Sequence, residues 1–302
     1  MDRRTFVRGT AAALAASRFP DAAASAARML TRPIPRTGEA LPVVGLGTWQ
    51  TFDPPRRTPE TLAPLEATLR ALHDAGGRVI DSSPMYGAAE SVAGELAERA
   101  GVKEALFFAT KVWTRGEQEG VRQMQASMRL LRRERLDLMQ VHNLVDWRTH
   151  LRTLRAWRDE GRVRYLGVTH YQPSAFDELE QIVTRERIDF VQLPYSADLR
   201  DAERRLLPAA QAAGVAVLVN VPFGGGGLLR RVLARPLPDE VRTWAPTWPQ
   251  ALLKFVLAHP AVTCVIPGTS NPRHVVDNAA AGTGRLPDER ERAALLRAIA
   301  RG

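Results

Sequence analysis

After residue 40 the sequence alternates short apolar runs with longer segments of helical period, and this alternation limits the possible folds more than any other feature. The pattern is typical of βαβ units, in which helices connect parallel strands. The apolar runs predict strands at Val43–Thr48, Arg78–Asp81, Leu106–Lys111, Leu136–His142, Arg164–Thr169, Phe190–Tyr195, Ala216–Val221 and Thr263–Pro267. The segments of helical period predict helices at Thr61–Ala75, Ser91–Arg99, Val121–Leu131, His150–Glu160, Ala175–Arg185, Ala202–Ala213 and Pro249–Ala258.

Eight strands with intervening helices in about 260 residues favour an α/β fold of the (β/α)8 TIM barrel type. An open sheet of eight strands is the structural alternative. An open sheet that binds a dinucleotide would carry a glycine fingerprint between a strand and a helix, and the sequence has none. The glycine run Gly224–Gly227 lacks the required spacing and is interpreted either as a mobile loop or as a segment near a cofactor. The sequence shows no internal repeat, so residues 31–302 are expected to form one domain.

The first 30 residues are similar to a twin-arginine export signal. Arg3 and Arg4 are followed two residues later by Phe6, and the alanine-rich, mildly apolar stretch Gly9–Ser17 comes next. A peptidase is expected to cut within Asp21–Ala27. We therefore expect the twin-arginine translocase to be a partner during export, and the location to be periplasmic or otherwise exported. The alternative is a basic amphipathic leader on a cytoplasmic protein.

Composition argues against several other classes of protein. With 45% hydrophobic and 25% charged residues, the chain has the composition of an ordinary globular protein. No run approaches the ~18 apolar residues that cross a bilayer, so no stable membrane span is expected. The net charge of +9 is spread along the chain, which argues against a nucleic-acid partner. The single cysteine, Cys264, excludes a disulfide framework within one chain.

Four polar side chains stand at or just after the ends of predicted strands, where the active sites of such barrels form. Asp81, Lys111 and His142 close the second, third and fourth strands, and Tyr86 lies in the loop after the second. Each of them alone is compatible with a structural role, as a helix cap or a buried core residue. Lysine is rare in this chain, which uses arginine for most of its 42 basic residues. Lys111 is therefore a candidate for a role that arginine cannot fill.

Together these four residues predict a site for proton delivery. A tyrosine with a pKa near ~10 is a poor acid at neutral pH unless a neighbouring ammonium stabilises its phenolate. Lys111 is expected to lower the pKa of Tyr86, and Asp81 to keep the ammonium charged and oriented. His142 would orient a substrate carbonyl through a hydrogen bond or share the proton transfer. An alternative enzyme class is a lyase or isomerase in which Lys111 forms a Schiff base with the substrate.

Seven motifs occur in the order found in the aldo-keto reductase family: Gly45–Trp49, Asp81–Gly87, Thr110–Lys111, Gln140–Asn143, Gly167–Tyr171, Gln192–Tyr195 and Ile266–Ser270. The sequence resembles that family from about residue 39 onward. The resemblance implies that Asp81, Tyr86, Lys111 and His142 form a catalytic tetrad with Tyr86 as the general acid. It also implies reduction of an aldehyde or ketone of a small-molecule substrate by hydride from NADPH/NADP, bound without a Rossmann fold. The alternative is a non-catalytic, nicotinamide-cofactor-binding sensor or docking subunit on the same barrel.

The resemblance further implies a cofactor site made of residues after the later strands. Thr169, His170 and Gln192 match positions that hold the nicotinamide carboxamide. Asn220 takes the position where the family often stacks an aromatic ring on the nicotinamide. The segment after the eighth strand matches the part that holds the adenosine phosphate and adenine, through Gly268, Thr269, Ser270, Arg273, His274, Asp277 and Asn278.

The preference for the 2′-phosphate of NADPH depends on two neighbouring residues of that segment. The position of the family's usual arginine is occupied by His274, and Arg273 lies one position earlier. We expect these two side chains to favour NADPH over NADH. The alternative interpretation is that Asn271 and Pro272 begin a helix on whose first turn Arg273 is a solvated residue.

Three aromatic residues are expected to line the substrate pocket. Trp49 and Trp113 follow the first and third strands, and Tyr171 follows the fifth. They would contribute an apolar wall at the end of the barrel that carries the four polar residues. Metal catalysis is not expected, because the histidines of the chain lack the spacing of metal ligands.

Overall fold

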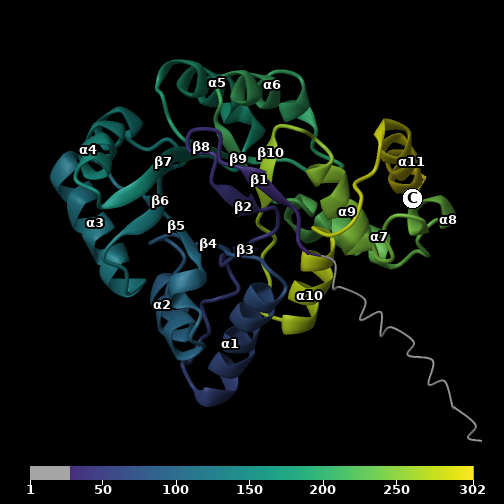
Figure 1. Cartoon of the computed structure of the whole chain (residues 1–302), viewed down its shortest axis with the longest axis horizontal. Coiled ribbons are helices and arrows are strands. Elements are labelled where there is room, and N and C mark those ends of the chain that lie inside the picture. The colour runs from purple at the N-terminus through teal and green to yellow at the C-terminus, as the bar shows by residue number, and fades with distance from the viewer. Residues whose placement is uncertain (1–27, 302) are drawn as a thin grey trace, which may run out of the picture.

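Eight parallel strands form a single sheet that closes on itself (Figure 1). The structure, a computed structural model, describes residues 28–301, so most of the export signal predicted for residues 1–30 lies outside the described residues. The barrel strands are β3 (Leu46–Gly47), β4 (Val79–Asp81), β5 (Phe107–Val112), β6 (Leu136–His142), β7 (Val163–Thr169), β8 (Phe190–Pro194), β9 (Ala216–Asn220) and β10 (Val262–Val265). Each strand pairs with the next one along the chain. All eight predicted strands are confirmed, and β6 has the predicted bounds.

The barrel closes between β10 and the segment that leads into β3. Gly47 forms a parallel bridge with Gly268, and the amide of Gly45 donates to the carbonyl oxygen of Val265 at 2.8 Å. The backbone passes so close to β4 that a Cβ on Gly45 would lie 2.7 Å from Val79 Cβ. Glycine is therefore needed at position 45 for the closure. These contacts confirm the closed (β/α)8 barrel over the open sheet.

Helices surround the strands on the outside of the barrel (Figure 1). They are α1 (Pro59–Asp74), α2 (Ala89–Arg99), α3 (Glu117–Leu130), α4 (Trp147–Asp159), α5 (Phe176–Arg185), α6 (Leu206–Ala212), α7 (Gly227–Leu233), α8 (Asp239–Arg242), α9 (Trp248–Leu257), α10 (Pro272–Ala280) and α11 (Glu289–Ala300). The seven predicted helices are confirmed, and α10 agrees with the alternative interpretation of its segment, whereas α7, α8 and α11 were not predicted. α7 and α8 are too short for a helical period to be recognised. No helix within residues 28–301 is long and apolar enough to cross a membrane.

The strands separate two apolar layers, because successive side chains of a strand point to opposite sides. In β5, Phe107 and Ala109 lie in the cluster inside the barrel. Phe108 and Val112 belong to the larger cluster between the strands and the helices. Lys111 continues the inward series at the carboxyl end of β5. The alternation of the strand therefore directs this lysine toward the barrel axis.

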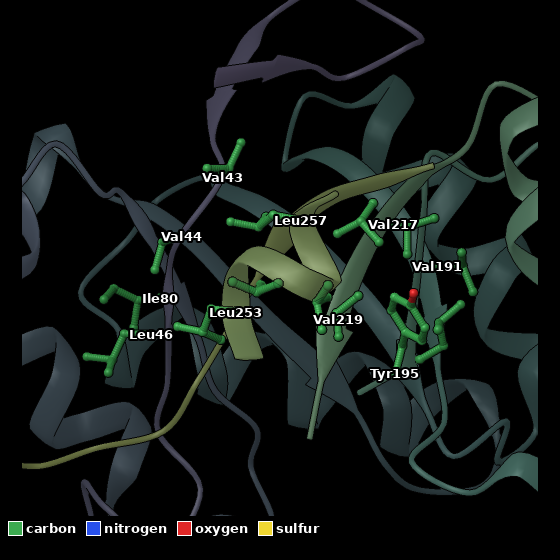
Figure 2. Packing of buried hydrophobic residues seen from close by; sticks show 14 of the residues in the cluster. Val43, Val44, Leu46, Ile80, Val191, Tyr195, Val217, Val219, Leu253 and Leu257 are labelled. Atoms are coloured by element: carbon green, nitrogen blue, oxygen red, sulfur yellow. The ribbon is translucent and has the colours of Figure 1, made fainter. Parts of the chain in front are cut away.

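Figure 2 shows the outer apolar layer beside α9. Leu253 and Leu257 of this helix lie between Val217 and Val219 of β9 and the segment that contains Val43. All five side chains are at most 2% exposed, and burial of such a side chain contributes about 1.5–3 kcal/mol. α9 thereby stabilises the barrel on the side where its first and last strands meet.

A short antiparallel hairpin, which the sequence pattern did not predict, precedes the barrel. It pairs β1 (Thr31–Pro33) with β2 (Ala40–Pro42). Ile34 and Leu41 of the hairpin are buried in the interior cluster with Phe190 and other residues from the beginnings of the barrel strands. The hairpin thus covers the amino-terminal end of the barrel, which leaves the carboxyl end for a site. Three-residue strands that end in proline carry no recognisable alternation, so the sequence gives little signal for them.

Candidate active site

A buried ion pair lies inside the carboxyl end of the barrel. Asp81 ends β4, and Lys111 lies near the end of the neighbouring strand β5. Lys111 Nζ donates to Asp81 Oδ2 at 2.6 Å and to the carbonyl oxygen of Ser82 at 2.7 Å. Lys111 is fully buried and Asp81 is 3% exposed. The ammonium therefore has a defined position and a defined counter-ion.

The charge state of Lys111 follows from these contacts. Burial by itself lowers the pKa of Lys111, but the nearby Asp81 and Tyr86 more than offset that effect, so the pKa is raised above its ordinary value. Lys111 is consequently an ammonium at neutral pH. A Schiff base requires a neutral amine, so the geometry argues against the alternative of a Schiff-base lyase or isomerase.

Tyr86 lies in the turn between β4 and α2, where two backbone hydrogen bonds hold it. Its amide donates to the carbonyl oxygen of Ser83 at 3.0 Å, and its carbonyl oxygen accepts from the amide of Ala89 at 3.1 Å. Lys111 Nζ lies 5.0 Å from the centre of the phenol ring. The structure therefore places the predicted acid beside the predicted ammonium.

The pKa of Tyr86 differs from the expectation. Burial raises this pKa, and the lowering effect of Lys111 offsets the burial only in part, so the net shift is upward. The predicted influence of Lys111 is present, but the predicted net lowering is wrong, because the phenol lies deeper than a strand-end loop suggested. A raised pKa keeps the phenol protonated at neutral pH, as a proton donor must be.

His142 ends β6 and faces both Tyr86 and the pocket. Its Nδ1 lies 3.0 Å from Ser83 Oγ, and its ring meets the ring of Tyr86 edge-on at 5.9 Å between centroids. Burial, together with the charge of Lys111 and the nearby His170, lowers the pKa of His142 to about 2. His142 is therefore a neutral imidazole at physiological pH. It can donate or accept a hydrogen bond but is not a cationic acid.

Two glutamines extend the site from Asp81 toward the later strands. Gln192 Nε2 donates to Asp81 Oδ1 at 2.8 Å, and Gln140 Nε2 donates to the same oxygen at 3.2 Å. Since a carboxylate only accepts, this contact orients the Gln192 amide and turns its Oε1 toward Thr169 and Asn220. Those residues donate to Gln192 Oε1 at 3.1 and 3.2 Å. Three of the predicted cofactor-binding residues, Thr169, Gln192 and Asn220, thus belong to one hydrogen-bonded network with Asp81.

Gln140 and Ser83 also belong to the site, although neither was predicted. Both lie within the motifs quoted above, yet neither ends a strand. Gln140 is two residues before His142 in β6, and side chains two apart on a strand point to the same side. This spacing was an available signal for Gln140. Nothing in the sequence pairs Ser83 with His142, because that contact joins two different strand ends.

The predicted phosphate and adenine residues lie after β10 and in the first turns of α10. Asn271 is the N-cap of α10, and its Oδ1 accepts from the amide of Arg273 at 3.0 Å. Thr269 Oγ1 lies 3.3 Å from His274 Nδ1. Arg273 and His274 are exposed. Exposure is expected both for solvated residues on the first turn of a helix and for residues that contact a phosphate, so it agrees with both interpretations. Gly268, Ser270 and Asn278 are in the same segment.

Asp277 has a different environment from its predicted neighbours. Its carboxylate accepts hydrogen bonds from Thr247 Oγ1 at 3.0 Å and from Gln250 Nε2 at 2.7 Å. Thr247 is the N-cap of α9, so Asp277 connects α10 to the beginning of α9. The carboxylate is thus engaged within the protein. Its assignment to the adenine remains a prediction without a supporting contact.

The three predicted pocket aromatics surround the carboxyl end of the barrel. Trp49, Trp113 and Tyr171 are 57%, 42% and 53% exposed, which is unusual for side chains of this size. The Trp113 ring lies 6.3 Å from the ring of His142, and Tyr171 stacks on His170 at 5.6 Å. Exposed aromatic surface next to a polar site is typical of a binding pocket.

The arrangement can deliver one proton to an oxygen atom and hold the charge that remains. Tyr86 presents a protonated phenol beside the Lys111 ammonium, Asp81 holds that ammonium in place, and neutral His142 is available for a further hydrogen bond. Among the described residues there is no group of three or more His, Cys, Asp or Glu side chains that could hold a metal ion. The fold and the site together define a (β/α)8 barrel with a buried Lys111–Asp81 ion pair beside a tyrosine and a histidine.

Comparison with known proteins agrees with that class. Residues 43–294 match the model of the Aldo/keto reductase family, and the chain belongs to this family of oxidoreductases. It is 30% identical to methylglyoxal reductase YeaE of Escherichia coli (strain K12), over 80% of this chain and 85% of that protein. It is 28% identical to an aldo-keto reductase of Mycobacterium sp. (strain JLS), over 80% of this chain and 83% of that protein.

Solved structures show the same relationship. An aldo/keto reductase from Klebsiella pneumoniae, in complex with NADP and acetate, superposes with a TM-score of 0.73 at 28% identity, over 87% of this chain and 93% of that one. An aldo-keto reductase from the same organism, in complex with NADPH, gives a TM-score of 0.74 at 27% identity, over 90% and 95% of the two chains. The family predicted from seven motifs is therefore confirmed.

Proposed function

We propose that this protein reduces aldehyde or ketone groups of small molecules with NADPH, and that Tyr86 donates the proton. The observation that carries the proposal is the contact of the half-buried Tyr86 with the Lys111–Asp81 ion pair. This contact gives the phenol a nearby positive charge at the moment when it loses its proton. Turnover needs such a centre, whereas the alternative of a cofactor-binding sensor does not.

The residues around the site fit the nicotinamide cofactor that the Klebsiella relatives contain in their structures. Asn220 Oδ1 is buried without a hydrogen-bond partner among the described residues, next to Thr169 and Gln192. The site therefore has a hydrogen-bond acceptor that no side chain of the protein uses, and the NH2 group of a carboxamide could donate to it. The N-terminus of the nine-residue helix α10, with Arg273 beside it, suits a phosphate group.

NADPH supplies the hydride when it is bound. The protein's own residues then act on the carbonyl oxygen, which becomes negatively charged as the hydride arrives. Neutral His142 orients that oxygen by a hydrogen bond, and Tyr86 protonates it. Lys111 stabilises the resulting phenolate, and Asp81 keeps Lys111 charged and in place. The exposed side chains of Trp49 and Trp113 offer apolar surface to the rest of the substrate.

A spectrophotometric screen tests the proposed activity. Purified protein would be mixed with NADPH and a panel of aldehydes, ketones and quinones, and the loss of NADPH absorbance would be followed. Methylglyoxal belongs in the panel because three of the similar proteins are named for its reduction. We expect turnover of at least one carbonyl class. NADPH binding without oxidation against any of them would favour the sensor alternative.

Cofactor preference gives a separate prediction. We expect kcat/KM to be higher with NADPH than with NADH, and the double variant R273A/H274A to lose roughly tenfold to a hundredfold of this preference. That range corresponds to one charge-assisted hydrogen bond to a phosphate. The measurement is kcat/KM for both cofactors in both proteins. An unchanged ratio in the variant, or a wild type that prefers NADH, would contradict the assignment of this turn.

We further propose that the protein is exported by the twin-arginine pathway as a folded holoprotein. Arg3 and Arg4 support this proposal, and the pathway accepts folded cargo. Met29 is buried in the hydrophobic core, and the amide of Leu30 donates to Gly282 O at 2.7 Å. These contacts favour a cleavage point before Met29, within or just after the Ala-rich stretch that ends at residue 27.

Export is tested by fractionation of cells that produce the full chain. The variant R3K/R4K is expected to remain in the cytoplasm with its leader intact and with normal reductase activity. The wild type is expected to be shorter and to occur outside the cytoplasm. A wild type that is uncleaved and entirely cytoplasmic would show that the leader is not an export signal, and would leave the reductase assignment untouched.

A further inference from the structure

A cluster of buried polar side chains lies on the outer face of β5, behind the Lys111–Asp81 pair. Glu90 on α2 is 2% exposed, and Thr110 on β5 and Ser127 on α3 are fully buried. Thr110 directly precedes Lys111 in the strand and therefore points to the opposite side, into the layer of helices. The mechanism described above uses none of these three groups.

The helices α2 and α3 approach each other closely at this place. A Cβ on Gly94 would lie 2.4 Å from the carbonyl oxygen of Leu130, so only glycine permits the observed separation. The close approach brings Ser127 near Glu90, where its hydroxyl contributes to lowering the pKa of the carboxyl. The cluster is thus built into the packing of two helices against one strand.

A hydrogen bond between Glu90 and Ser127 would complete this cluster, donated either by Ser127 to an ionised Glu90 or by a neutral Glu90 to Ser127. Thr110 Oγ1 donates to Glu90 Oε1 at 2.5 Å. Glu90 Oε2 and Ser127 Oγ are buried and have no hydrogen-bond partner in the part of the chain that the structure describes. Buried polar atoms without partners destabilise the folded protein. A proton on Oε2, donated to Ser127 Oγ, would satisfy both atoms at once.

The electrostatic surroundings also favour a neutral carboxyl group. Burial raises the pKa of Glu90, and Thr110, Ser127 and Lys111 counteract this only in part. Lys111 acts on Glu90 from the other side of β5, but its ammonium is bound to Asp81 at 2.6 Å. From α3 the group that faces Glu90 is the uncharged Ser127. No close cation therefore compensates a charge on Glu90.

The position of Glu90 connects it to the proton donor. Glu90 lies in the first turn of α2, and the preceding residue Ala89 is hydrogen-bonded to Tyr86. The bond between Glu90 and Thr110 therefore links the helix that follows Tyr86 to the strand that carries Lys111. This link spans the two elements whose separation sets the distance between phenol and ammonium.

We propose that Glu90 is a positioning residue, held as a neutral carboxylic acid between Thr110 and Ser127, that fixes Tyr86 relative to Lys111 without adding a second anion beside the ammonium. The inference rests on the proposed role of Tyr86 as proton donor. An ionised Glu90 would weaken the positive field that Lys111 exerts on the phenol, and Tyr86 would become a poorer acid. Glutamine can reproduce the hydrogen bonds of the neutral acid, with its oxygen toward Thr110 and its NH2 group toward Ser127.

Kinetics of two variants test the positioning role. Glu90→Ala is expected to lower kcat by about tenfold to a hundredfold, as for a small displacement of reacting groups, with little change in the KM for NADPH. Glu90→Gln is expected to keep the kcat and the pH profile of the wild type. A Glu90→Gln variant whose kcat falls as far as that of Glu90→Ala would overturn the proposal, because it would show that the negative charge is needed.

Infrared spectroscopy of the ligand-free protein tests the protonation state directly, even if Glu90→Ala does not fold. The wild type at pH 7 is expected to show the carbonyl stretch of a protonated carboxylic acid, and Glu90→Gln to lack it. Glu98 on the same helix is an exposed control, bound to Lys103 at 3.0 Å, and E98Q should retain this band. A wild type without such a band would overturn the inference. No cofactor takes part, so this result is distinguishable from a failure of carbonyl reduction.

Discussion

Replacing Tyr86 with phenylalanine is expected to lower the kcat of carbonyl reduction by about 10²–10⁴-fold, the range that a positioned general acid contributes. In the proposed mechanism the phenol protonates the substrate, so its removal takes away the proton donor. His142 cannot replace it as a cationic acid, because burial and the neighbouring Lys111 lower the pKa of His142 to about 2. The ring of Tyr86 remains in the variant, so the shape of the pocket is kept.

The dissociation constant for NADPH is expected to change by no more than a few-fold in Tyr86→Phe, since the phenol does not hold the cofactor. It would be measured by fluorescence titration alongside the steady-state kinetics. Tyr165→Phe is a matched control, because Tyr165 is 3% exposed and its hydroxyl bonds to Thr37 and Glu39 near the hairpin, away from the site. The control should keep its kcat. Equal losses of NADPH binding and turnover in Tyr86→Phe would defeat the assignment.

Lys111→Arg is expected to be nearly as damaging as Tyr86→Phe, with a loss of at least about 10²-fold in kcat. The site of Lys111 is fully buried, and its Nζ is held at 2.6 Å from Asp81 and 2.7 Å from Ser82 O. A guanidinium group is larger and planar, so it cannot occupy this position and keep both bonds. The positive charge survives the substitution, but its distance to Tyr86 does not.

The pH profile supplies a second measurement for Lys111→Arg. Reduction requires the protonated phenol, so kcat/KM falls as the pH rises through the pKa of Tyr86. Lys111 lowers that pKa, against the effect of burial. Displacing the cation should therefore move the alkaline limb to higher pH and also lower the plateau. Near-normal rates in Lys111→Arg would remove Lys111 from the proton-delivery site.

Lys254→Arg is the matched control for a buried lysine. Lys254 is 3% exposed, and its Nζ donates to the carbonyl oxygens of Thr283 and Arg285 at 2.6 and 2.9 Å, outside the candidate site. Lys254→Arg is expected to lower the thermal stability while leaving kcat unchanged. A comparison of Tm and kcat in the two variants then separates the loss of packing from the loss of catalysis.

Much of the fold could be predicted from the sequence, because each barrel strand has its own apolar run and each long helix its own period. The bounds of β6 were predicted to the residue, and α10 begins at Pro272 after an Asn271 cap, as one interpretation of that segment proposed. The hairpin β1–β2 was missed, since its short strands are held by contacts with the barrel interior. α11 was also missed, because it follows the last strand and so lies outside the alternation of strands and helices. Its capping box, formed by Asp288 and Glu291, was an available signal.

The four polar residues of the site could be predicted because each stands at or after the end of one of three neighbouring strands, a position that the sequence reveals. Their surroundings could not. Gln140 and Ser83 act through contacts across strands, and Glu90 lies behind the site on a helix. The pKa of Tyr86 also depends on depth of burial, which the order of residues along a loop does not disclose.

The sequence by itself determined the class of fold, the family and the candidate residues for proton delivery, since periodicity and motif order are properties of the chain. The tertiary structure alone decided how these residues affect one another. Closure of the barrel brings Asp81 and Lys111 to 2.6 Å and removes them from water. The strength of that interaction, the neutral state of His142 and the raised pKa of Tyr86 all depend on distance and desolvation. Neither quantity exists until strands distant in sequence are packed side by side.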